Sequence, residues 1–409
     1  MRARWLFPVW AVVLAACGGL RGDGQDPALW GSDAMLLLGS GGGVVSVDPA
    51  DGSVRFRGAG VSTLGSWSTV FTTRRSEGGT FLEGRDAATG RVRSTISLPG
   101  ELAVRVASLD GSQVALMEPL PAGHSPWTPI PRATTDIVVA DPTGVRDPMQ
   151  FHLAGNLEPE AFSADGRTLY LIRFVPPTEP TAYRVSGLDL SSGRVYPVAT
   201  GTKPRVVETM SGTRLEQVAS PDGRMLYTLY TTDPASYTGP HAHQAVPVAF
   251  IHTLNLEEGW AHCIALPEVM WGGDPRNEAM ALSPDGDRLH VVDVARDLVA
   301  IMNTRNLEMT GIEVDFPAVG GAAHASVAPT GELFVSDGPW LAAVDVGREG
   351  ITGRRGMREA VTALGTGPGG LYVALPDRVE VLDPDLRRRV ATIPSPAVDD
   401  LAYVGVVTP

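Results

Sequence analysis

The sequence predicts an all-β fold of repeated four-stranded antiparallel units that close into a ring. Two kinds of tight turn alternate along the chain, and short apolar or mixed segments of strand length flank each turn. No segment with helical periodicity reaches a useful length. Hairpin turns that recur at near-regular spacing indicate a repeated β unit rather than a mixed fold.

The first kind of turn is represented by Ser283-Pro284-Asp285-Gly286, which leads into an apolar segment at 288–292. The proline presets φ, the aspartate side chain bonds back to the backbone, and the glycine accepts the left-handed conformation. Related turns occur at 163–166, 220–223 and 328–331. We expect each of them to join the first two strands, a and b, of a unit.

The second kind of turn is represented by Asp86-Ala87-Ala88-Thr89-Gly90, with relatives at 48–52, 141–144, 189–193 and 255–259. Each follows an apolar run and precedes a strand of mixed character. These turns are expected to join strands c and d. Because the two kinds alternate, four strands belong to each unit.

The repeat spacing places the units at 34–59, 61–99, 102–154, 157–200, 213–268, 277–317, 322–357 and 360–394. The first unit lacks an a strand, and the chain ends with a spare one, expected from Val398 to Tyr403. The simplest arrangement is a circular closure in which this last strand completes the first unit. Closure removes the exposed sheet edges that an open repeat would leave.

Turns such as Ser220-Pro221-Asp222-Gly223, followed by apolar strands, resemble those of β-propellers with YVTN-like or WD40-like repeats. The resemblance covers nearly everything after residue 33. It implies a β-propeller of four-stranded blades, eight by repeat count; seven is the alternative if the weak unit at 61–99 is miscounted. No repeat has the Gly-His and Trp-Asp pair of true WD40 proteins. Such propellers host many unrelated roles, so the resemblance does not specify a function.

The N-terminus predicts export and lipid anchoring. Arg2 and Arg4 precede an apolar stretch that is too short for a membrane span and suits a signal-peptide core. It ends in Leu14-Ala15-Ala16-Cys17-Gly18, which resembles the bacterial lipobox, with Cys17 as the lipidated residue. The alternative is an ordinary signal peptide that is cleaved nearby.

We therefore expect a signal peptide at 1–16, a lipid anchor with a flexible tether at 17–33, and a single propeller domain at 34–409. The predicted location is the cell envelope, lipid-anchored on the extracytoplasmic side of a bacterial membrane.

Composition narrows the function classes. The formal net charge is −13, which argues against a nucleic-acid partner, because phosphate binding needs a basic surface. The chain has two cysteines, so a lipidated Cys17 leaves Cys263 without an intramolecular disulfide partner. Cys263 lies in an alternating strand and is expected to be a buried, small apolar side chain. Its neighbour His262 would point to the opposite side of the strand and would not serve as its base.

The loops that do not repeat predict where function lies. The b–c loops at 117–134, 175–182 and 231–247 are long, and the d–a links at 201–212 and 267–276 open on the same face. The stereotyped turns all lie on the other face. Variable loops on a rigid scaffold are where binding usually concentrates.

Eight residues of these loops are candidates for the binding face: His124, Trp127, Asp233, Tyr237, His241, His243, Trp271 and Asp274. His241 and His243 are two residues apart, which places both on one side of an extended segment. A metal site would need a third ligand such as Asp233, His124 or Asp274. The alternative is that the histidines anchor loops through ordinary hydrogen bonds. The aromatic residues either form a contact surface for a protein or glycan, or fold back to close the blade mouths.

The sequence thus predicts a monomeric, lipid-anchored scaffold that binds an unidentified extracytoplasmic protein or ligand. It contacts the membrane only through its lipid, and neither catalysis nor a cofactor is expected. The alternative is a lactonase-like, metal-assisted hydrolase with a divalent metal near His241 and His243. No nucleophile elbow, phosphate loop or dinucleotide fingerprint is present in a workable context.

Overall fold

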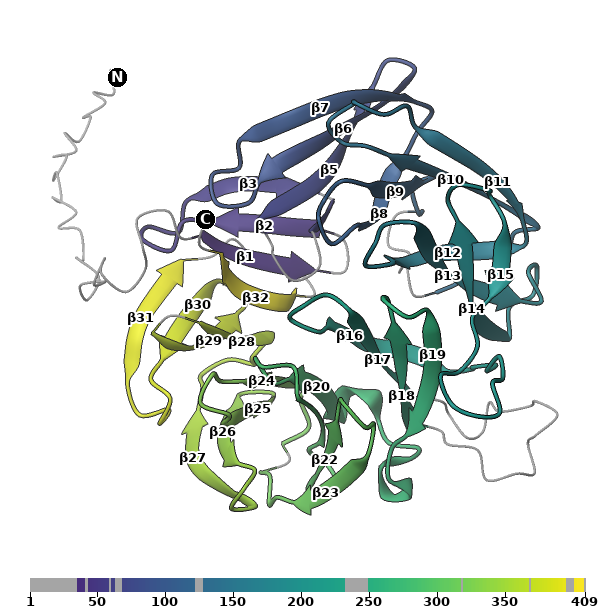
Figure 1. The fold of residues 1–409 in the computed structure, drawn as a ribbon. Coiled ribbons are helices and arrows are strands. Elements are labelled where there is room, and N and C mark those ends of the chain that lie inside the picture. The colour runs from purple at the N-terminus through teal and green to yellow at the C-terminus, as the bar shows by residue number, and fades with distance from the viewer. Residues whose placement is uncertain are drawn as a thin grey trace, which may run out of the picture.

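Short runs rich in Val, Leu, Ile and Tyr form antiparallel β-strands, because branched and aromatic side chains fit a pleated, half-buried surface. The computed structural model describes residues 35–40, 43–58, 60–62, 68–121, 128–231, 249–317, 319–367, 369–394 and 401–407. Within these ranges the strands form eight four-stranded sheets, arranged as blades around a central axis (Figure 1). The fold is an eight-bladed β-propeller, as the repeat count predicts.

The first four blades contain the following strands. Blade 1 consists of β1 (Met35–Ser40), β2 (Gly43–Val47), β3 (Val54–Gly58) and β32 (Leu401–Val407). Blade 2 consists of β4 (Gly60–Ser62), β5 (Thr69–Ser76), β6 (Gly79–Asp86) and β7 (Val92–Pro99). Blade 3 consists of β8 (Ala103–Ala107), β9 (Val114–Met117), β10 (Thr134–Ala140) and β11 (Met149–Ala154). Blade 4 consists of β12 (Asn156–Phe162), β13 (Thr168–Val175), β14 (Ala182–Asp189) and β15 (Val195–Pro197).

The remaining blades follow in chain order. Blade 5 consists of β16 (Thr213–Ala219), β17 (Met225–Thr231), β18 (Ala249–Asn255) and β19 (Trp260–Ala265). Two 3₁₀ turns, η3 (Glu268–Met270) and η4 (Pro275–Asn277), lead to blade 6, which consists of β20 (Glu278–Leu282), β21 (Arg288–Asp293), β22 (Leu298–Asn303) and β23 (Met309–Glu313). Blade 7 consists of β24 (Ala323–Val327), β25 (Leu333–Asp337), β26 (Trp340–Asp345) and β27 (Gly350–Gly356). Blade 8 consists of β28 (Ala363–Gly367), β29 (Gly370–Leu375), β30 (Arg378–Leu382) and β31 (Arg389–Pro394).

The a–b turn is closed by its own side chains, as the sequence predicts. Ser283 Oγ donates to Asp285 Oδ1 at 2.5 Å and accepts the Arg288 amide at 2.9 Å. Gly286 has φ 77°, a conformation that costs a glycine little. The same serine–aspartate pair recurs in blades 3, 4 and 5, so one face of the propeller is held by a repeated local hydrogen-bond network.

The ring is closed by strand β32, which pairs antiparallel with β1, and Figure 1 shows these two strands next to each other. The closing strand lies a few residues later than the predicted 398–403, because the apolar residues 404–407 pair with β1. Behind this seam, Val45 and Val47 of blade 1 pack with Tyr372 and Val381 of blade 8. The first unit therefore takes its missing strand from the C-terminus, as predicted.

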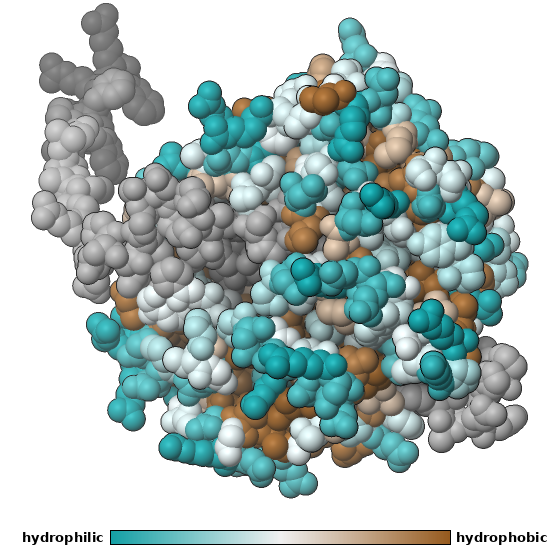
Figure 2. Space-filling view, viewed as in Figure 1, coloured by the Kyte–Doolittle hydropathy of each residue, from teal (hydrophilic) through white to brown (hydrophobic). Residues whose placement is uncertain are grey.

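The hydrophobic core is divided among the junctions between blades. Each of the eight clusters of buried side chains joins two neighbouring blades, such as Leu229 and Ile251 of blade 5 with Leu289 and Val291 of blade 6. The face seen in Figure 2 is mostly hydrophilic, with hydrophobic residues gathered over blades 6 and 7. Stability therefore comes from packing each blade on the next rather than from one central core.

Candidate functional site

Most of the loop residues predicted from the sequence lie outside the described residues. These are His124, Trp127, Asp233, Tyr237, His241 and His243. Their roles, including a metal held by His241 and His243, remain predictions. Within the described part of the chain, no group of three or more His, Cys, Asp or Glu side chains is arranged to hold a metal ion.

The other two predicted residues, Trp271 and Asp274, have local partners in the link between blades 5 and 6. The indole of Trp271 donates to the Leu266 carbonyl at 2.8 Å and packs against the core between those blades. Asp274 accepts from the amide of Arg276 and pairs with its guanidinium at 2.7 Å. These contacts with Arg276 lower the pKa of Asp274. Both side chains thus shape the link, and neither lines the pocket described next.

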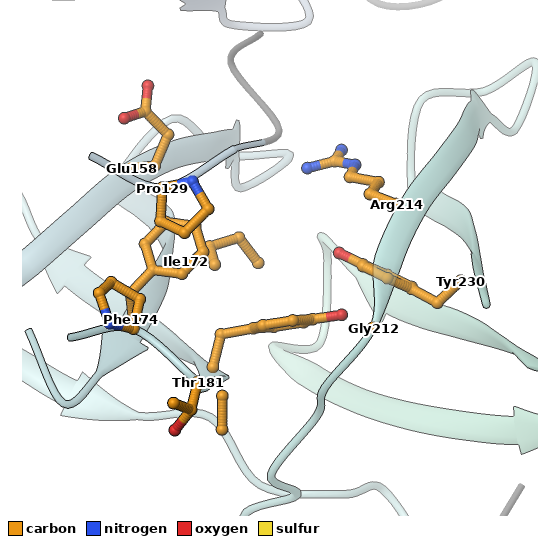
Figure 3. A pocket seen from close by; sticks show the side chains of 11 residues that line it. Pro129, Glu158, Ile172, Phe174, Thr181, Gly212, Arg214 and Tyr230 are labelled. Atoms are coloured by element: carbon orange, nitrogen blue, oxygen red, sulfur yellow. The ribbon is translucent and has the colours of Figure 1, made fainter. Parts of the chain in front are cut away.

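A pocket of about 190 Å³ opens between blades 4 and 5, on the face that carries the long loops. Its lining comes from the first three strands of blade 4, the first two strands of blade 5 and the loops that join them: Pro129, Glu158, Ile172, Phe174, Pro180, Thr181, Ala182, Tyr183, Gly212, Arg214 and Tyr230. Figure 3 shows Arg214 and Tyr230 reaching from blade 5 toward Ile172 and Phe174 of blade 4. A second cavity, between blades 6 and 7, measures about 10 Å³ and is too small for more than a water molecule.

The inner strands around this pocket are irregular. In β8, β12 and β16 the pairing register shifts at Arg105, Glu160 and Leu215, whereas β20, β24 and β28 pair without a shift. Such bulges turn a side chain away from the regular alternation, and they are frequent next to binding sites. Three consecutive blades thus have bulged inner strands, and two of these strands, β12 and β16, contribute residues to the pocket lining.

Two groups of buried charges flank the pocket. Glu158 pairs with Arg105 at 2.7 Å and with Arg132 at 2.8 Å. Arg214 of blade 5 pairs with Glu160 of blade 4 at 2.8 Å, and these two side chains are 9% and 2% exposed. Gln217 adds a hydrogen bond of 2.7 Å to Glu160. Each carboxylate therefore has a cationic partner on a different strand, which ties blades 3, 4 and 5 together.

The walls of the pocket are fixed by hydrogen bonds. Asn156, fully buried, donates to the carbonyls of Ile130 and Pro177, which belong to two different loops. Tyr183 and Met210 exchange both backbone hydrogen bonds, so the link between blades 4 and 5 is pinned to β14. A site that is fixed before binding loses less conformational freedom when a ligand enters.

Two tyrosines and a phenylalanine form the aromatic part of the pocket lining. The rings of Tyr183 and Tyr230 are 5.3 Å apart, and Phe174 lies 6.1 Å from Tyr183 in an edge-on arrangement. The Tyr183 hydroxyl is buried, and the neighbouring hydroxyl is that of Tyr230, to which it is hydrogen-bonded. Burial raises the pKa of both phenols, so both remain protonated donors at neutral pH.

Cys263 and His252 lie behind the pocket. Cys263 Sγ is 3.8 Å from His252 Nδ1 on the paired strand, and Tyr230 meets the His252 ring edge-on. The sequence suggests only His262 as a neighbour of the thiol, but His262 instead pairs with Glu208. Burial lowers the pKa of His252 to about 3 and raises that of Cys263. Neither group is activated. Cys263 packs against the core between blades 4 and 5 as a small side chain, but it is half-buried rather than buried as expected.

The sequence patterns described above do not include the residues that form this pocket, although one signal is present. Glu158 and Glu160 lie two residues apart in a segment expected to be an inner a strand, as do Arg214 and Glu216. Charged residues are rare in the inner strands of a β fold unless they are paired or functional. Two acidic residues in one a strand, and one basic and one acidic residue in the next, therefore indicate charge pairing between blades 4 and 5.

Comparison with known proteins concerns the fold. Apo AztD from Citrobacter koseri is similar with a TM-score of 0.54 and 11% identity, over 92% of this chain and 98% of that one. A second AztD structure is similar with a TM-score of 0.53 and 12% identity, over 91% of this chain and 98% of that one. Dihydro-heme d1 dehydrogenase NirN in complex with DHE is similar with a TM-score of 0.49 and 13% identity, over 89% of this chain and 73% of that one. No protein-family model matches the sequence, and no curated protein sequence matches it either. At these identities the chain shares an architecture with the two AztD structures and nothing finer is implied.

Proposed function

We propose that this chain is a binding protein of the bacterial cell envelope, and that its ligand enters the pocket between blades 4 and 5. The observation that carries the proposal is the pocket itself, on the long-loop face and lined in part by two bulged inner strands, β12 and β16. Concave, mostly apolar sites with a few converging polar groups are typical of ligand binding. The neighbouring thiol and imidazole are not activated, which favours binding over nucleophilic catalysis.

Binding at the pocket is tested by a fragment screen with ligand-observed NMR on the purified chain. Thr181 is exposed and borders the pocket, so Thr181→Trp should cover its mouth without disturbing the core. We expect fragments that bind the parent protein to lose binding in Thr181→Trp and to keep it in Thr310→Trp, which changes an exposed position on β23. If no fragment is sensitive to Thr181→Trp, the pocket is not the site.

The envelope location rests on the N-terminal sequence and is a separate part of the proposal. Cys17 within Leu14-Ala15-Ala16-Cys17-Gly18 would carry the lipid, and residues 18–33 would link it to the propeller. No helix in the described part of the chain is long and apolar enough to cross a membrane. A Cys17→Ser variant is expected in the soluble fraction and should not incorporate labelled palmitate. Unchanged membrane retention of this variant would rule out the anchor.

The hydrolase alternative depends on His241 and His243. Metal analysis of the purified protein distinguishes it from the binding proposal. Tightly held, stoichiometric metal that disappears in a double His241→Ala, His243→Ala variant would favour the hydrolase. Metal content that is low and equal in the parent protein and the double variant would reject the hydrolase alternative and favour the binding proposal.

A further inference from the structure

We infer that the pocket between blades 4 and 5 binds an uncharged aromatic molecule with a single ring, an inference that rests on the proposed function. Three features of the lining lead to this ligand class: its aromatic walls, its volume, and the pairing of the charged side chains that it contains.

The walls of the pocket favour a flat aromatic body. Figure 3 shows Ile172 and Phe174 of blade 4 on one side of the pocket and Tyr230 of blade 5 on the other. The ring of Tyr183 lies 6.1 Å from that of Phe174, in an edge-on arrangement, and 5.3 Å from that of Tyr230. Rings in edge-on or offset contact attract each other beyond the gain from buried area. A ligand ring between these walls therefore gains more than an aliphatic body of the same size.

The volume of the pocket limits the ligand to one ring. The space measures about 190 Å³. An apolar cavity of about 150 Å³ is large enough to bind benzene. The pocket therefore accommodates one ring with a short substituent and excludes a cofactor of several fused rings.

The charged side chains of the lining are already paired within the protein. The lining contains one carboxylate and one guanidinium, those of Glu158 and Arg214. Glu158 pairs with Arg105 and Arg132, and Arg214 pairs with Glu160. An ionic ligand would leave its hydration shell and would have to compete with these existing pairs for a counter-charge. Because burying a charge without a new partner is costly, the pocket favours an uncharged ligand.

The two phenol groups of the lining supply no charge either. The hydroxyls of Tyr183 and Tyr230 are hydrogen-bonded to each other, and burial raises the pKa of both, so both stay neutral. Contact with the rings and the apolar side chains, rather than ionic pairing, therefore decides which ligand fits.

Three probes of similar size and different charge test the uncharged assignment: benzyl alcohol, benzoate and benzylammonium. We expect titrations of the parent protein followed by NMR to give benzyl alcohol a Kd at least about tenfold lower than that of either ion. The reason is that the pocket does not replace the hydration that an ion gives up. Benzoate or benzylammonium binding as tightly as benzyl alcohol would overturn this assignment.

Cyclohexylmethanol tests the aromatic assignment, because it resembles benzyl alcohol in size and has the same hydroxyl but no π system. We expect it to bind about two- to tenfold more weakly than benzyl alcohol, since it cannot make edge-on or offset ring contacts. Equal or tighter binding of cyclohexylmethanol would reject an aromatic ligand.

Phe174→Leu removes one ring from the wall and keeps an apolar side chain there. We expect the advantage of benzyl alcohol over cyclohexylmethanol to shrink at least about twofold in this variant. The ratio of two Kd values on one protein is insensitive to a small loss of stability. Phe151→Leu is the matched control and should keep the parent ratio, because Phe151 is a partly buried residue of β11 outside the pocket. An unchanged ratio in Phe174→Leu would contradict the role assigned to the aromatic wall.

The fragment screen separates the two levels of the proposal. Fragments whose binding is sensitive to Thr181→Trp, but which are mainly ionic or aliphatic, would reject the ligand class and leave the binding function. A screen with no fragment sensitive to Thr181→Trp would reject both.

Discussion

Blades 3 to 5 and blades 6 to 8 are built from the same repeat, yet they differ in their innermost strands. In the first group β8, β12 and β16 are bulged, and buried charges are paired across blades. In the second group the inner strands are regular, and Glu278 is buried with neither oxygen hydrogen-bonded. The repeat thus determines the propeller scaffold, whereas the bulges and buried charges of blades 3 to 5 depart from the repeat where the pocket lies.

The largest expected effect comes from breaking the ion pair between blades 4 and 5. Arg214→Leu leaves Glu160 buried at 2% exposure without its cation. We expect a loss of about 3–5 kcal/mol in the free energy of unfolding, measured with urea, because an uncompensated buried charge is strongly unfavourable.

The matched control for this variant is Arg305→Ala. It removes an arginine from an exposed pair with Asp287, whose two side chains are 76% and 40% exposed. This change should cost less than about 1 kcal/mol. Equal costs for the two variants would mean that the charges between blades 4 and 5 are not effectively buried.

In blades 6 to 8, which have regular inner strands, removing a buried charge should raise the free energy of unfolding instead of lowering it. Burial, and the Asp293 carboxylate on the paired strand, raise the pKa of Glu278 to about 8, while Arg296 partly opposes them. The folded state therefore binds a proton that the unfolded state has released between about pH 4.5 and pH 8, and Glu278 lowers stability as pH rises through that window.

Glu278→Gln removes this linked proton. We expect the variant to be more stable than the parent by about 1–3 kcal/mol near pH 9, with the difference shrinking toward zero near pH 4. Urea unfolding at both pH values measures it. A variant that is less stable than the parent at pH 9 would show that the carboxylate has a stabilising partner.

The smallest effect concerns the face that both sectors share. Ser163 of blade 4 and Ser283 of blade 6 make the same two hydrogen bonds, to an aspartate and to a backbone amide. We expect Ser163→Ala and Ser283→Ala each to cost about 0.5–1.5 kcal/mol, with equal values for the two blades. A clear difference between them would show that the turn face is not uniform and that the sectors differ on both faces.

The sequence was sufficient for the scaffold because the determinants are local. Each turn such as Ser283-Pro284-Asp285-Gly286 closes through its own side chains, so its spacing reports the number of strands and blades. The same reasoning identified the closing strand and the face with the long loops. The position of β32 was displaced by a few residues because pairing with β1, a distant segment, selects its register.

The pocket could not be predicted in this way because its parts are distant in sequence. Arg214 and Glu160 are brought together by the packing of two blades, and Asn156 connects loops from two different blades. The bulges at Arg105, Glu160 and Leu215 also shift side chains away from simple alternation. The sequence predicts a site built from loop histidines and aromatic residues. The described pocket is instead lined by charged residues of inner strands and by tyrosines at the junction of blades 4 and 5.

The pairing of β32 with β1 has a consequence for how the protein is made. Blade 1 lacks its innermost strand until the end of the chain becomes available, while every later blade is composed of consecutive segments. Contacts between such distant segments form slowly, because a long loop must close first. A chain cut short by proteolysis or interrupted synthesis would expose an unpaired β1 edge, and such edges recruit other strands. Pairing of β32 with β1 therefore separates molecules whose ring is closed from molecules that lack the closing strand.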